Sequence, residues 1–341
     1  MEVTELRKQV LALMDSEENY AVHFMEHVNR KRTSPFEVHA FTDREKLCEY
    51  SNNHRIEILL ISEHDMEEGA SRVRAGQTIV LTDGNDSYGL YPNVCKYQAS
   101  SAVMRQVMEV YGQKAEEGDG RGSGAILKPP TRITGIFSPV ARCMKTSFAL
   151  AIGQCLARTK AVLYLNFEAP SGLNVLLGDS WERDISDVIY YIRRGERNIA
   201  PRLLPLVREI GTLGFVPPSP SPAEIYSVTA DEWRQLFLSL RRDSAYESLV
   251  LDLGELPLVC PEVLEECDII YMPVLDDPFA RAKIAAFEEE LRLRDADVSE
   301  RMRTLRLNVP GCDLSGENWA EHLPYSPLGQ IARERITIDR L

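Results

Sequence analysis

A lysine followed by two hydroxyl residues opens an apolar segment in the second half of the chain. The strand-like run RITGIF is followed by SPVARCMKTS and then by the helix-like run FALAIGQCLA. A loop between a strand and a helix can hold phosphate, because its backbone N–H groups and the helix dipole face the anion. In such loops a lysine neutralises the phosphates and a hydroxyl binds magnesium. Lys145 and Thr146 stand at these two places.

The glycines of a phosphate loop are missing from this segment. Met144 stands directly before the lysine, and Ala141 and Arg142 occupy the place of a glycine pair. Glycine permits positive φ and close approach of the backbone, so the side chains here predict weaker phosphate binding. The guanidinium of Arg142 is expected to offset part of this loss, because it pairs well with phosphate. The residues expected to hold a nucleotide in this segment are Arg142, Cys143, Met144, Lys145, Thr146 and Ser147.

Two carboxylates follow apolar strands further along the chain. Glu168 comes after the strand Val162–Phe167, and Asp252 ends the run SLVLD. Ligands of open α/β sheets bind at the carboxyl ends of the strands, so Lys145, Glu168 and Asp252 are expected to point to one site. An aspartate at such a position organises magnesium-bound water. We predict Glu168 and Asp252 as catalytic residues, and Thr146 and Asp252 as magnesium ligands.

The elements that must position these residues follow from the alternation of apolar patterns after residue 130. The expected strands are Arg132–Phe137, Val162–Phe167, Ser248–Leu253, Asp268–Val274 and Leu305–Val309. The expected helices are Thr146–Ala157, Ile185–Arg194 and Pro278–Arg292. This alternation predicts a doubly wound α/β sheet.

The first 112 residues show a similar alternation. The expected strands are Val10–Met14, Phe36–Ala40, Ile56–Ile61, Thr78–Thr82 and Val94–Tyr97, and the expected helices are Tyr20–Val28, Asp43–Tyr50 and Ser100–Tyr111. The pattern predicts a parallel sheet with helices on both faces. Residues 113–130 are rich in Gly, Glu, Ser and Pro, as is typical of a flexible linker. We therefore predict domains at 1–112 and 131–341, joined by a linker at 113–130.

The first domain resembles a response-regulator receiver domain, in which an aspartate at the end of the third strand accepts phosphate. Ser62 stands where that aspartate would be, and Asp15, followed by two glutamates, is expected in the acidic pocket. Thr82 and Lys96 match the family's hydroxyl and lysine positions. A serine hydroxyl cannot become an acyl phosphate, so we predict a pseudo-receiver domain without phosphorelay activity.

The phosphate-loop segment, the runs YLNFE and SDVIYYIRRG and the domain order resemble the ParA/MinD-type P-loop ATPases. More narrowly, the whole chain is similar to the TadZ/CpaE proteins that localise tight-adherence pilus machinery. The resemblance implies a receiver-like, flavodoxin-like domain followed by a ParA/MinD-like P-loop domain. It also implies ATP and Mg²⁺ as cofactors, a homodimer, and pilus or secretion-system proteins as partners. The implied location is cytoplasmic, with recruitment to a cell pole or to membrane-associated machinery.

The same resemblance assigns roles to single residues. Asp252 matches the Walker B aspartate of the family, Asn308 its base-contacting asparagine, and Asn166-Phe167-Glu168 its Asp-x-Asp segment. Val140 takes the place of the signature lysine, which in the family reaches the partner's nucleotide across the dimer. Losing one positive contact to a transition-state phosphate costs about 3 kcal/mol or more. Weak or absent ATP hydrolysis is therefore expected.

Composition restricts the classes of partner. The chain has 341 residues and a formal net charge of −13, which gives it no whole-molecule attraction to nucleic acid or anionic lipid. Nucleic-acid binding is not expected. The chain ends in QIARERITIDRL, where the charges are mixed and the last residues alternate like a strand, so no direct membrane binding is expected. The seven cysteines form no C-x-x-C pair, which is typical of a reduced compartment.

Three hypotheses for function remain open at this point. The first is a ParA-like nucleotide-binding localisation or assembly factor with weak or no hydrolysis. The second is a nucleotide-independent pseudo-ATPase scaffold, which the four residues Val140, Ala141, Met144 and Asn166 favour. The third is a response-regulator-type signalling protein, against which Ser62 argues.

Overall fold

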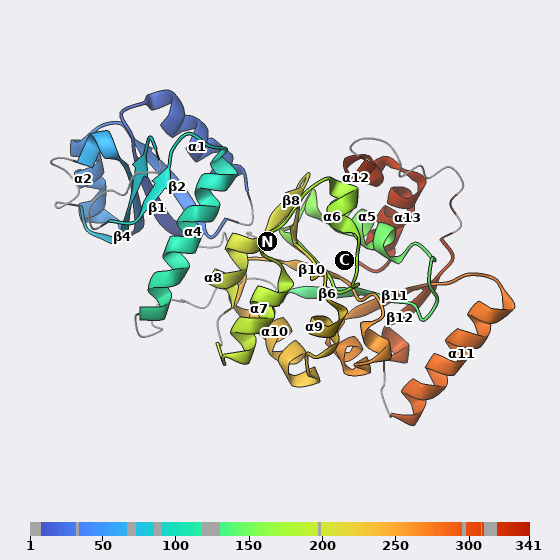
Figure 1. The fold of residues 1–341 in the computed structure, drawn as a ribbon. Coiled ribbons are helices and arrows are strands. Elements are labelled where there is room, and N and C mark those ends of the chain that lie inside the picture. Colours follow the sequence, from blue (N-terminus) through green and yellow to red (C-terminus); the bar gives the residue numbers. More distant parts are fainter. Residues whose placement is uncertain are drawn as a thin grey trace. The chain divides into compact units, whose positions relative to one another are not determined.

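A computed structural model of the chain describes residues 8–31, 34–66, 73–84, 91–117, 130–196, 199–294, 298–307, 309 and 319–341. The chain divides into two compact units, Met1–Leu127 and Lys128–Leu341. Each unit is built around a β-sheet of its own (Figure 1). No helix among the described residues is long and apolar enough to cross a membrane.

The first unit contains a five-stranded parallel sheet with the strand order β2-β1-β3-β4-β5. Its strands are β1 (Gln9–Met14), β2 (Phe36–Phe41), β3 (Ile56–Ser62), β4 (Ala75–Thr82) and β5 (Asn93–Cys95). Its helices are α1 (Glu18–Arg30), α2 (Arg44–Asn53), α4 (Ser100–Glu117) and the short 3-10 helix η1 (Glu63–Asp65). This strand order is that of flavodoxin-like sheets, so the predicted fold class is confirmed.

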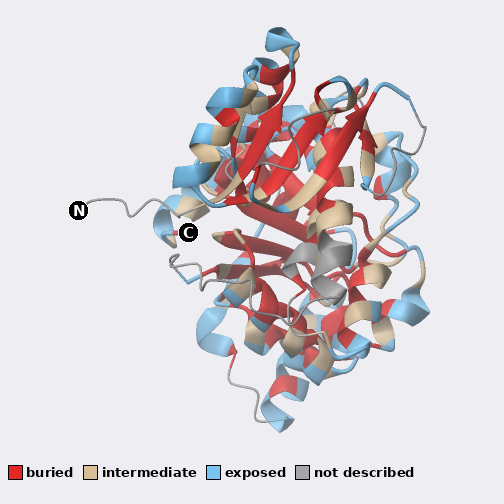
Figure 2. Ribbon diagram, turned by 90° about the vertical axis from the view of Figure 1, so that its left-hand side faces the viewer, coloured by how far each residue is buried: buried red, intermediate tan, exposed pale blue. Residues whose placement is uncertain are grey.

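The sequence explains these elements locally. The middle strands β1 and β3 are nearly continuous apolar runs that are buried along most of their length (Figure 2), as expected for strands covered on both faces. Helix α1 buries Ala21, Phe24 and Val28, whose spacing of three and four residues places them on one face. Asp43 caps α2, because its side chain accepts a hydrogen bond from the N–H of Glu45 at 2.8 Å.

The second unit contains a seven-stranded sheet with the order β12-β11-β6-β10-β7-β9-β8, in which β8 alone runs antiparallel to its neighbour. Its strands are β6 (Arg132–Ile136), β7 (Val162–Asn166), β8 (Arg208–Ile210), β9 (Leu213–Val216), β10 (Ser248–Asp252), β11 (Ile269–Pro273) and β12 (Met302–Leu305). Its helices are α5 (Lys145–Ala157), α6 (Leu173–Leu177), α7 (Ile185–Arg193), α8 (Ala200–Leu203), α9 (Pro222–Tyr226), α10 (Ala230–Asp243), α11 (Pro278–Leu293), α12 (Trp319–His322) and α13 (Pro327–Ile338). Short 3-10 helices lie at η2 (Leu204–Leu206), η3 (Leu256–Leu258), η4 (Pro261–Glu266), η5 (Ser299–Arg301) and η6 (Leu323–Tyr325).

Helix α5 lies in the core of the second unit. Eleven of its residues are buried, because it packs between the central strands and α13 in one apolar cluster. A second cluster covers the other face of the sheet and joins α7 and α10 to the strands. Both α7 and α10 begin with a capping box, formed by Asp184 with Asp187 and by Thr229 with Glu232. These caps define the residues at which α7 and α10 start.

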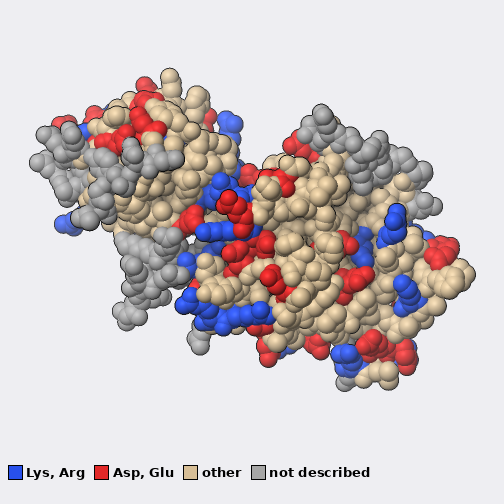
Figure 3. Space-filling view, viewed as in Figure 1, with Lys and Arg blue, Asp and Glu red and all other residues tan. Residues whose placement is uncertain are grey.

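Charged side chains of both signs are interspersed on the face shown in Figure 3. In the second unit, exposed arginines pair with partly buried carboxylates, as Arg193 does with Glu232 at 3.2 Å and Arg242 with Asp243 at 2.8 Å. Surface pairs of this kind contribute only about 0–1 kcal/mol to stability. The apolar clusters therefore stabilise each unit by itself far more than its surface charges do.

Three expectations for element positions were wrong. The last strand is β12, Met302–Leu305, and not Leu305–Val309; it pairs in parallel with β11. The chain ends in helix α13 and not in a strand-like segment, because Ser326 caps the helix and Leu328 and Ala332 bury one face of it. Helix α4 continues to Glu117, into the residues predicted as linker.

Candidate functional site

The loop between β6 and α5 keeps a glycine-like backbone without glycine. Arg142 and Met144 have φ values of 58° and 66°. This left-handed region costs about 1–2 kcal/mol for a residue with a side chain. These are two of the positions at which the sequence lacks the expected glycines. The loop therefore retains the turn that a phosphate loop needs, at a cost in backbone strain.

The side chains of this loop point in different directions. Ala141 and Arg142 are exposed, whereas Cys143 is buried. Met144 is half-buried and packs against the apolar cluster around α5, so its thioether contributes to packing in this structure. Burial raises the pKa of the Cys143 thiol, which keeps it neutral.

Lys145 begins α5 and turns its side chain back over the loop. Its Nζ donates to the carbonyl oxygens of Ser138 at 3.2 Å and Val140 at 3.4 Å. The residue is only 8% exposed. Within the described part of the chain, its ammonium forms no ion pair with a carboxylate. The charge of Lys145 acts on Asp252 without direct contact, so an anion bound at this place would add a direct charged partner for the ammonium.

Thr146, Glu168 and Asp252 lie together, as the sequence predicts. The Thr146 hydroxyl donates to Glu168 Oε2 at 2.9 Å. Asp252 is fully buried at the end of β10, and β10 pairs with β7 so that Asp252 lies opposite Asn166. The pKa of Asp252 is raised to about 6, chiefly by burial and also by the charge of Glu168, whereas the hydrogen bond from Thr146 and the charge of Lys145 act in the opposite direction. The cluster therefore has an excess of negative charge.

A buried tyrosine and asparagine connect the two carboxylates. The Tyr164 hydroxyl donates to Asp252 Oδ2 at 3.3 Å, and Asn166 Nδ2 donates to the Tyr164 oxygen at 3.0 Å. Asn166 Oδ1 accepts from the backbone N–H of Glu168 at 2.7 Å. The sequence analysis missed Tyr164. The available signal was its spacing of two residues from Asn166, which places both side chains on one face of β7.

Gly254 is required beside these carboxylates. It has a φ of 53°, and a Cβ there would lie 2.7 Å from Glu168 Cα. Its N–H also donates to Asp252 Oδ1 at 3.3 Å. Any side chain at this position would displace Glu168, so the glycine after the strand fixes the distance between the two acidic residues.

The other predicted site residues are placed as follows. Ser147 is half-buried in the first turn of α5. Val140 is 6% exposed, and its carbonyl oxygen accepts from Lys145 and from Cys143 Sγ at 3.1 Å. Asn308 lies outside the described residues.

The first unit holds a second buried lysine. Lys96 is 1% exposed and donates to Asp15 Oδ1 at 3.1 Å and Glu17 Oε1 at 2.9 Å. Burial lowers the pKa of Lys96, but the hydrogen bonds to the two carboxylates raise it by more. Its ammonium also lies 4.8 Å from the ring centre of Tyr20. The predicted acidic pocket is thus formed, and the protein's own lysine fills it.

Ser62 is the last residue of β3, and the residue before it, Ile61, pairs with Met14, the residue before Asp15. Ser62 is 1% exposed, and its hydroxyl has no hydrogen-bond partner among the described residues. Thr82, predicted as the partner hydroxyl, donates instead to the carbonyl oxygen of Gly84 at 2.7 Å. Glu63 directly follows β3, and its Oε1 accepts a hydrogen bond from the N–H of Asp83.

These features define a two-domain α/β protein, with a flavodoxin-like first unit and a doubly wound second unit that carries a strand–loop–helix site with a lysine at the helix start. Residues 7–112 match the family model described as TadZ-like, receiver domain. The first unit is therefore a TadZ-like receiver domain, and the resemblance found in its sequence is confirmed.

Solved structures similar to this chain include a ParA family ATPase, a plasmid partition protein and a cobyrinic acid a,c-diamide synthase. A ParA family ATPase from Chlorobium tepidum is 14% identical, with 58% of this chain and 82% of that chain covered and a TM-score of 0.43. A putative plasmid partition protein from Borrelia burgdorferi, bound to AMPPNP, is 15% identical, with 52% and 74% covered and a TM-score of 0.42. Cobyrinic acid a,c-diamide synthase from Mycobacterium smegmatis, with an ATP analogue and magnesium, is 16% identical, with 51% and 72% covered and a TM-score of 0.40. No curated protein matches the chain in sequence.

Proposed function

We propose that the chain is a ParA-like nucleotide-binding localisation or assembly factor with weak or no ATP hydrolysis. The observation that carries this proposal is the buried ammonium of Lys145, whose hydrogen-bond partners among the described residues are carbonyl oxygens. A phosphate at the start of α5 would supply the missing negative charge and would accept hydrogen bonds from the loop N–H groups. ATP is the proposed ligand, held by the loop residues 140–147.

Magnesium is the proposed second cofactor. The donors near Lys145 are the Thr146 hydroxyl and the carboxylates of Glu168 and Asp252. Mg²⁺ prefers oxygen ligands, so this donor set fits the ion. The raised pKa of Asp252 supports the fit, because burial and the neighbouring Glu168 charge make a bound cation favourable there. In this proposal Thr146 and Asp252 bind the ion, and Glu168 orients water.

Weak hydrolysis follows from the buried side chain of Val140. A valine in this place cannot supply a positive charge to a partner's nucleotide, and such a contact contributes about 3 kcal/mol or more to the transition state. Arg142 is exposed beside the loop, and in this proposal its guanidinium contacts phosphate. We therefore expect the protein to bind ATP and to hydrolyse it slowly or not at all.

The proposed partners are a second copy of the chain and components of a Tad-type pilus or secretion system. The match of residues 7–112 to the TadZ-like receiver family supports this assignment. The first unit would then serve as the docking platform, and the second unit as the nucleotide-controlled dimerisation unit. Recruitment to a cell pole or to membrane-associated machinery is part of the same proposal.

The proposal is tested by sedimentation velocity with and without ATP and Mg²⁺. We expect ATP with Mg²⁺ to shift the wild type toward a dimer and the Lys145→Ala variant to stay unchanged. Lys160→Ala is the matched control, because it removes the same charge from the far end of α5, beyond its last residue. A dimer that forms equally well without nucleotide would contradict the proposal.

A second function is favoured by one specific observation. Lys145 is already hydrogen-bonded to its own loop. These bonds hold the loop in place without a nucleotide, as a nucleotide-independent scaffold requires. The scaffold hypothesis expects no response to nucleotide in either oligomeric state or stability. The same sedimentation experiment therefore separates the two functions.

A further inference from the structure

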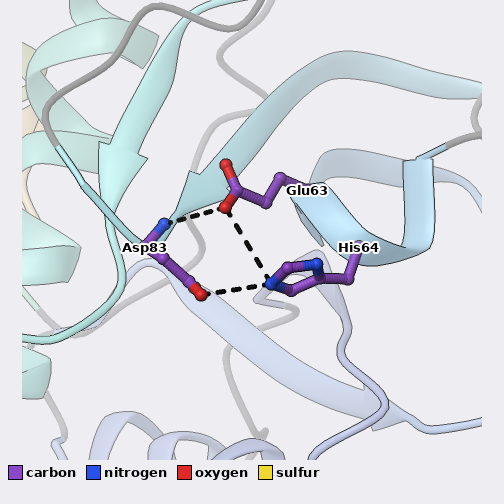
Figure 4. Close-up of side chains that lie close together, drawn as sticks. All are labelled: Glu63, His64 and Asp83. Carbon is purple, nitrogen blue, oxygen red and sulfur yellow. Dashed lines mark hydrogen bonds and ion pairs between the residues drawn. The ribbon is translucent and has the colours of Figure 1, made fainter.

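Three side chains with metal-binding atoms converge at one edge of the first unit (Figure 4). Glu63 and His64 belong to the turn that follows β3, and Asp83 follows β4 directly. The two strands pair in parallel with Ser62 opposite Leu81. The residues just beyond both strand ends are therefore brought side by side by the fold.

The distances between the three groups fit a shared ion. His64 Nε2 lies 3.1 Å from Asp83 Oδ2 and 3.9 Å from Glu63 Oε1. The three ligand atoms all lie within 4.8 Å of one another. Atoms that each lie about 2.0–2.2 Å from one ion are separated by roughly 3–3.5 Å. A small movement of Glu63 would complete the geometry.

The backbone holds this arrangement in place. The N–H of Asp83 donates to Glu63 Oε1 at 3.3 Å, which directs the glutamate toward the next strand. The Thr82 hydroxyl donates to the carbonyl oxygen of Gly84 at 2.7 Å, which fixes the turn that carries Asp83. The group therefore rests on the ends of two paired strands.

His64 differs from His39 in the number of carboxylates near its ring. His39 pairs with a single carboxylate, that of Glu37, at 3.6 Å. At His64 two carboxylates approach the same ring nitrogen. The nearby Lys96 forms its ion pairs with Asp15 and with a second carboxylate of the same cluster, so it does not neutralise Glu63 or Asp83 by contact.

We propose that Glu63, His64 and Asp83 form a binding site for one divalent transition-metal cation. One imidazole nitrogen and two carboxylate oxygens suit Zn²⁺ and its first-row neighbours better than Mg²⁺ or Ca²⁺, which take oxygen ligands. The side chain of His64 is 63% exposed and that of Asp83 37%, so water completes the coordination. The three residues of the site differ from Asp15 and Glu17, the carboxylates that pair with Lys96.

Calorimetric titration of the full chain with Zn²⁺, in a phosphine reductant, tests this site. We expect the wild type to bind one equivalent that His64→Ala loses, and Glu63→Gln to weaken this binding by more than about tenfold. His39→Ala is the matched control, since it removes a histidine beside a carboxylate in the same unit, and it should bind as the wild type does. Excess Mg²⁺ should not displace the Zn²⁺.

Two results would overturn the site. One is Zn²⁺ binding by His64→Ala with the stoichiometry and affinity of the wild type. The other is the absence of saturable Zn²⁺ binding by the wild type. Far-UV circular dichroism of each variant separates lost binding from lost folding. If His64→Ala does not fold, Asp83→Asn gives the same test, with the same two outcomes.

Discussion

Each unit of this molecule places one buried lysine near the carboxyl end of a parallel sheet, and the two lysines have different partners. Lys96 forms ion pairs with Asp15 at 2.8 Å and Glu17 at 2.9 Å. Within the part of the chain that the structure describes, Lys145 donates to two carbonyl oxygens of the loop that precedes it. The two residues are 1% and 8% exposed, so neither is solvated like a surface lysine.

The difference separates a structural lysine from a ligand-binding one. An ammonium matched by carboxylates is stabilised by the fold itself, and removing it leaves a buried negative charge. An ammonium with only neutral acceptors keeps a net positive charge that a bound anion would neutralise. The first unit therefore pairs its lysine with its own carboxylates, while the second has the lysine at which we propose that an anion binds.

The largest expected effect comes from replacing each lysine by methionine. Lys96→Met leaves Asp15 buried without a counter-charge, and breaking such a pair costs about 3–5 kcal/mol. Lys145→Met removes a cation that has no carboxylate partner, so we expect a change within about 1 kcal/mol. Urea unfolding measured by circular dichroism reports both units. Tryptophan fluorescence reports the second unit alone, because all three tryptophans lie there, at 181, 233 and 319.

In Lys96→Met, circular dichroism should show a transition at a lower urea concentration than in the wild type. The fluorescence transition should occur at the same urea concentration as in the wild type. The double variant Asp15→Asn/Lys96→Met should recover part of the loss, because it removes both charges. Equal destabilisation by the two methionine variants would show that the two lysines do not differ as described.

Asp252 should give the next largest effect. Burial raises its pKa to about 6, well above its unfolded value. The protonated carboxyl therefore stabilises the fold below about pH 4, and this stability is lost as the pH rises through about 6. At about pH 7.5, Asp252→Asn should raise the free energy of unfolding by up to about 3 kcal/mol, and near pH 4 the gain should vanish.

Guanidinium unfolding followed by tryptophan fluorescence at the two pH values measures this effect. Asp231→Asn serves as the control, because that side chain is 93% exposed and should not change stability at either pH. A loss of stability in Asp252→Asn at the higher pH would mean that the buried carboxylate is fully stabilised by its hydrogen bonds. The site would then carry no excess negative charge.

The smallest effect concerns the left-handed residues of the loop. Arg142 is exposed, so Arg142→Gly should relieve backbone strain and stabilise the second unit by about 1 kcal/mol. Met144→Gly relieves similar strain but loses packing against the α5 cluster, so its net change should be close to zero. Thermal unfolding of both variants measures the difference. A destabilised Arg142→Gly would show that this turn is not strained.

Much of the sheet architecture follows from apolar runs alone. The run at β3, Ile56–Ser62, is continuous because helices cover both faces of a parallel sheet. Short elements between β7 and β10, such as β9 at Leu213–Val216, have too few residues for a pattern to identify them. The last helix was missed because its final residues alternate like a strand, whereas the cap at Ser326 and the proline after it decide the structure.

The site was predictable where motif spacing and strand ends determine it. Asp252 belongs to such a position at the end of β10, and Lys145 is the first residue of α5, the helix that follows β6. The link through Tyr164 was not predictable, because it depends on the register that sets Asp252 opposite Asn166.

The central claim is that the buried charge of Lys145 marks a nucleotide site. Its most direct test is the melting temperature, measured by tryptophan fluorescence, of the wild type, Lys145→Met and Lys96→Met with and without ATP and Mg²⁺. Ligand at about 100 times its dissociation constant adds about 2.7 kcal/mol of stability. We predict this shift in the wild type and in Lys96→Met, and its loss in Lys145→Met. No shift in the wild type, or an equal shift in Lys145→Met, would contradict the account.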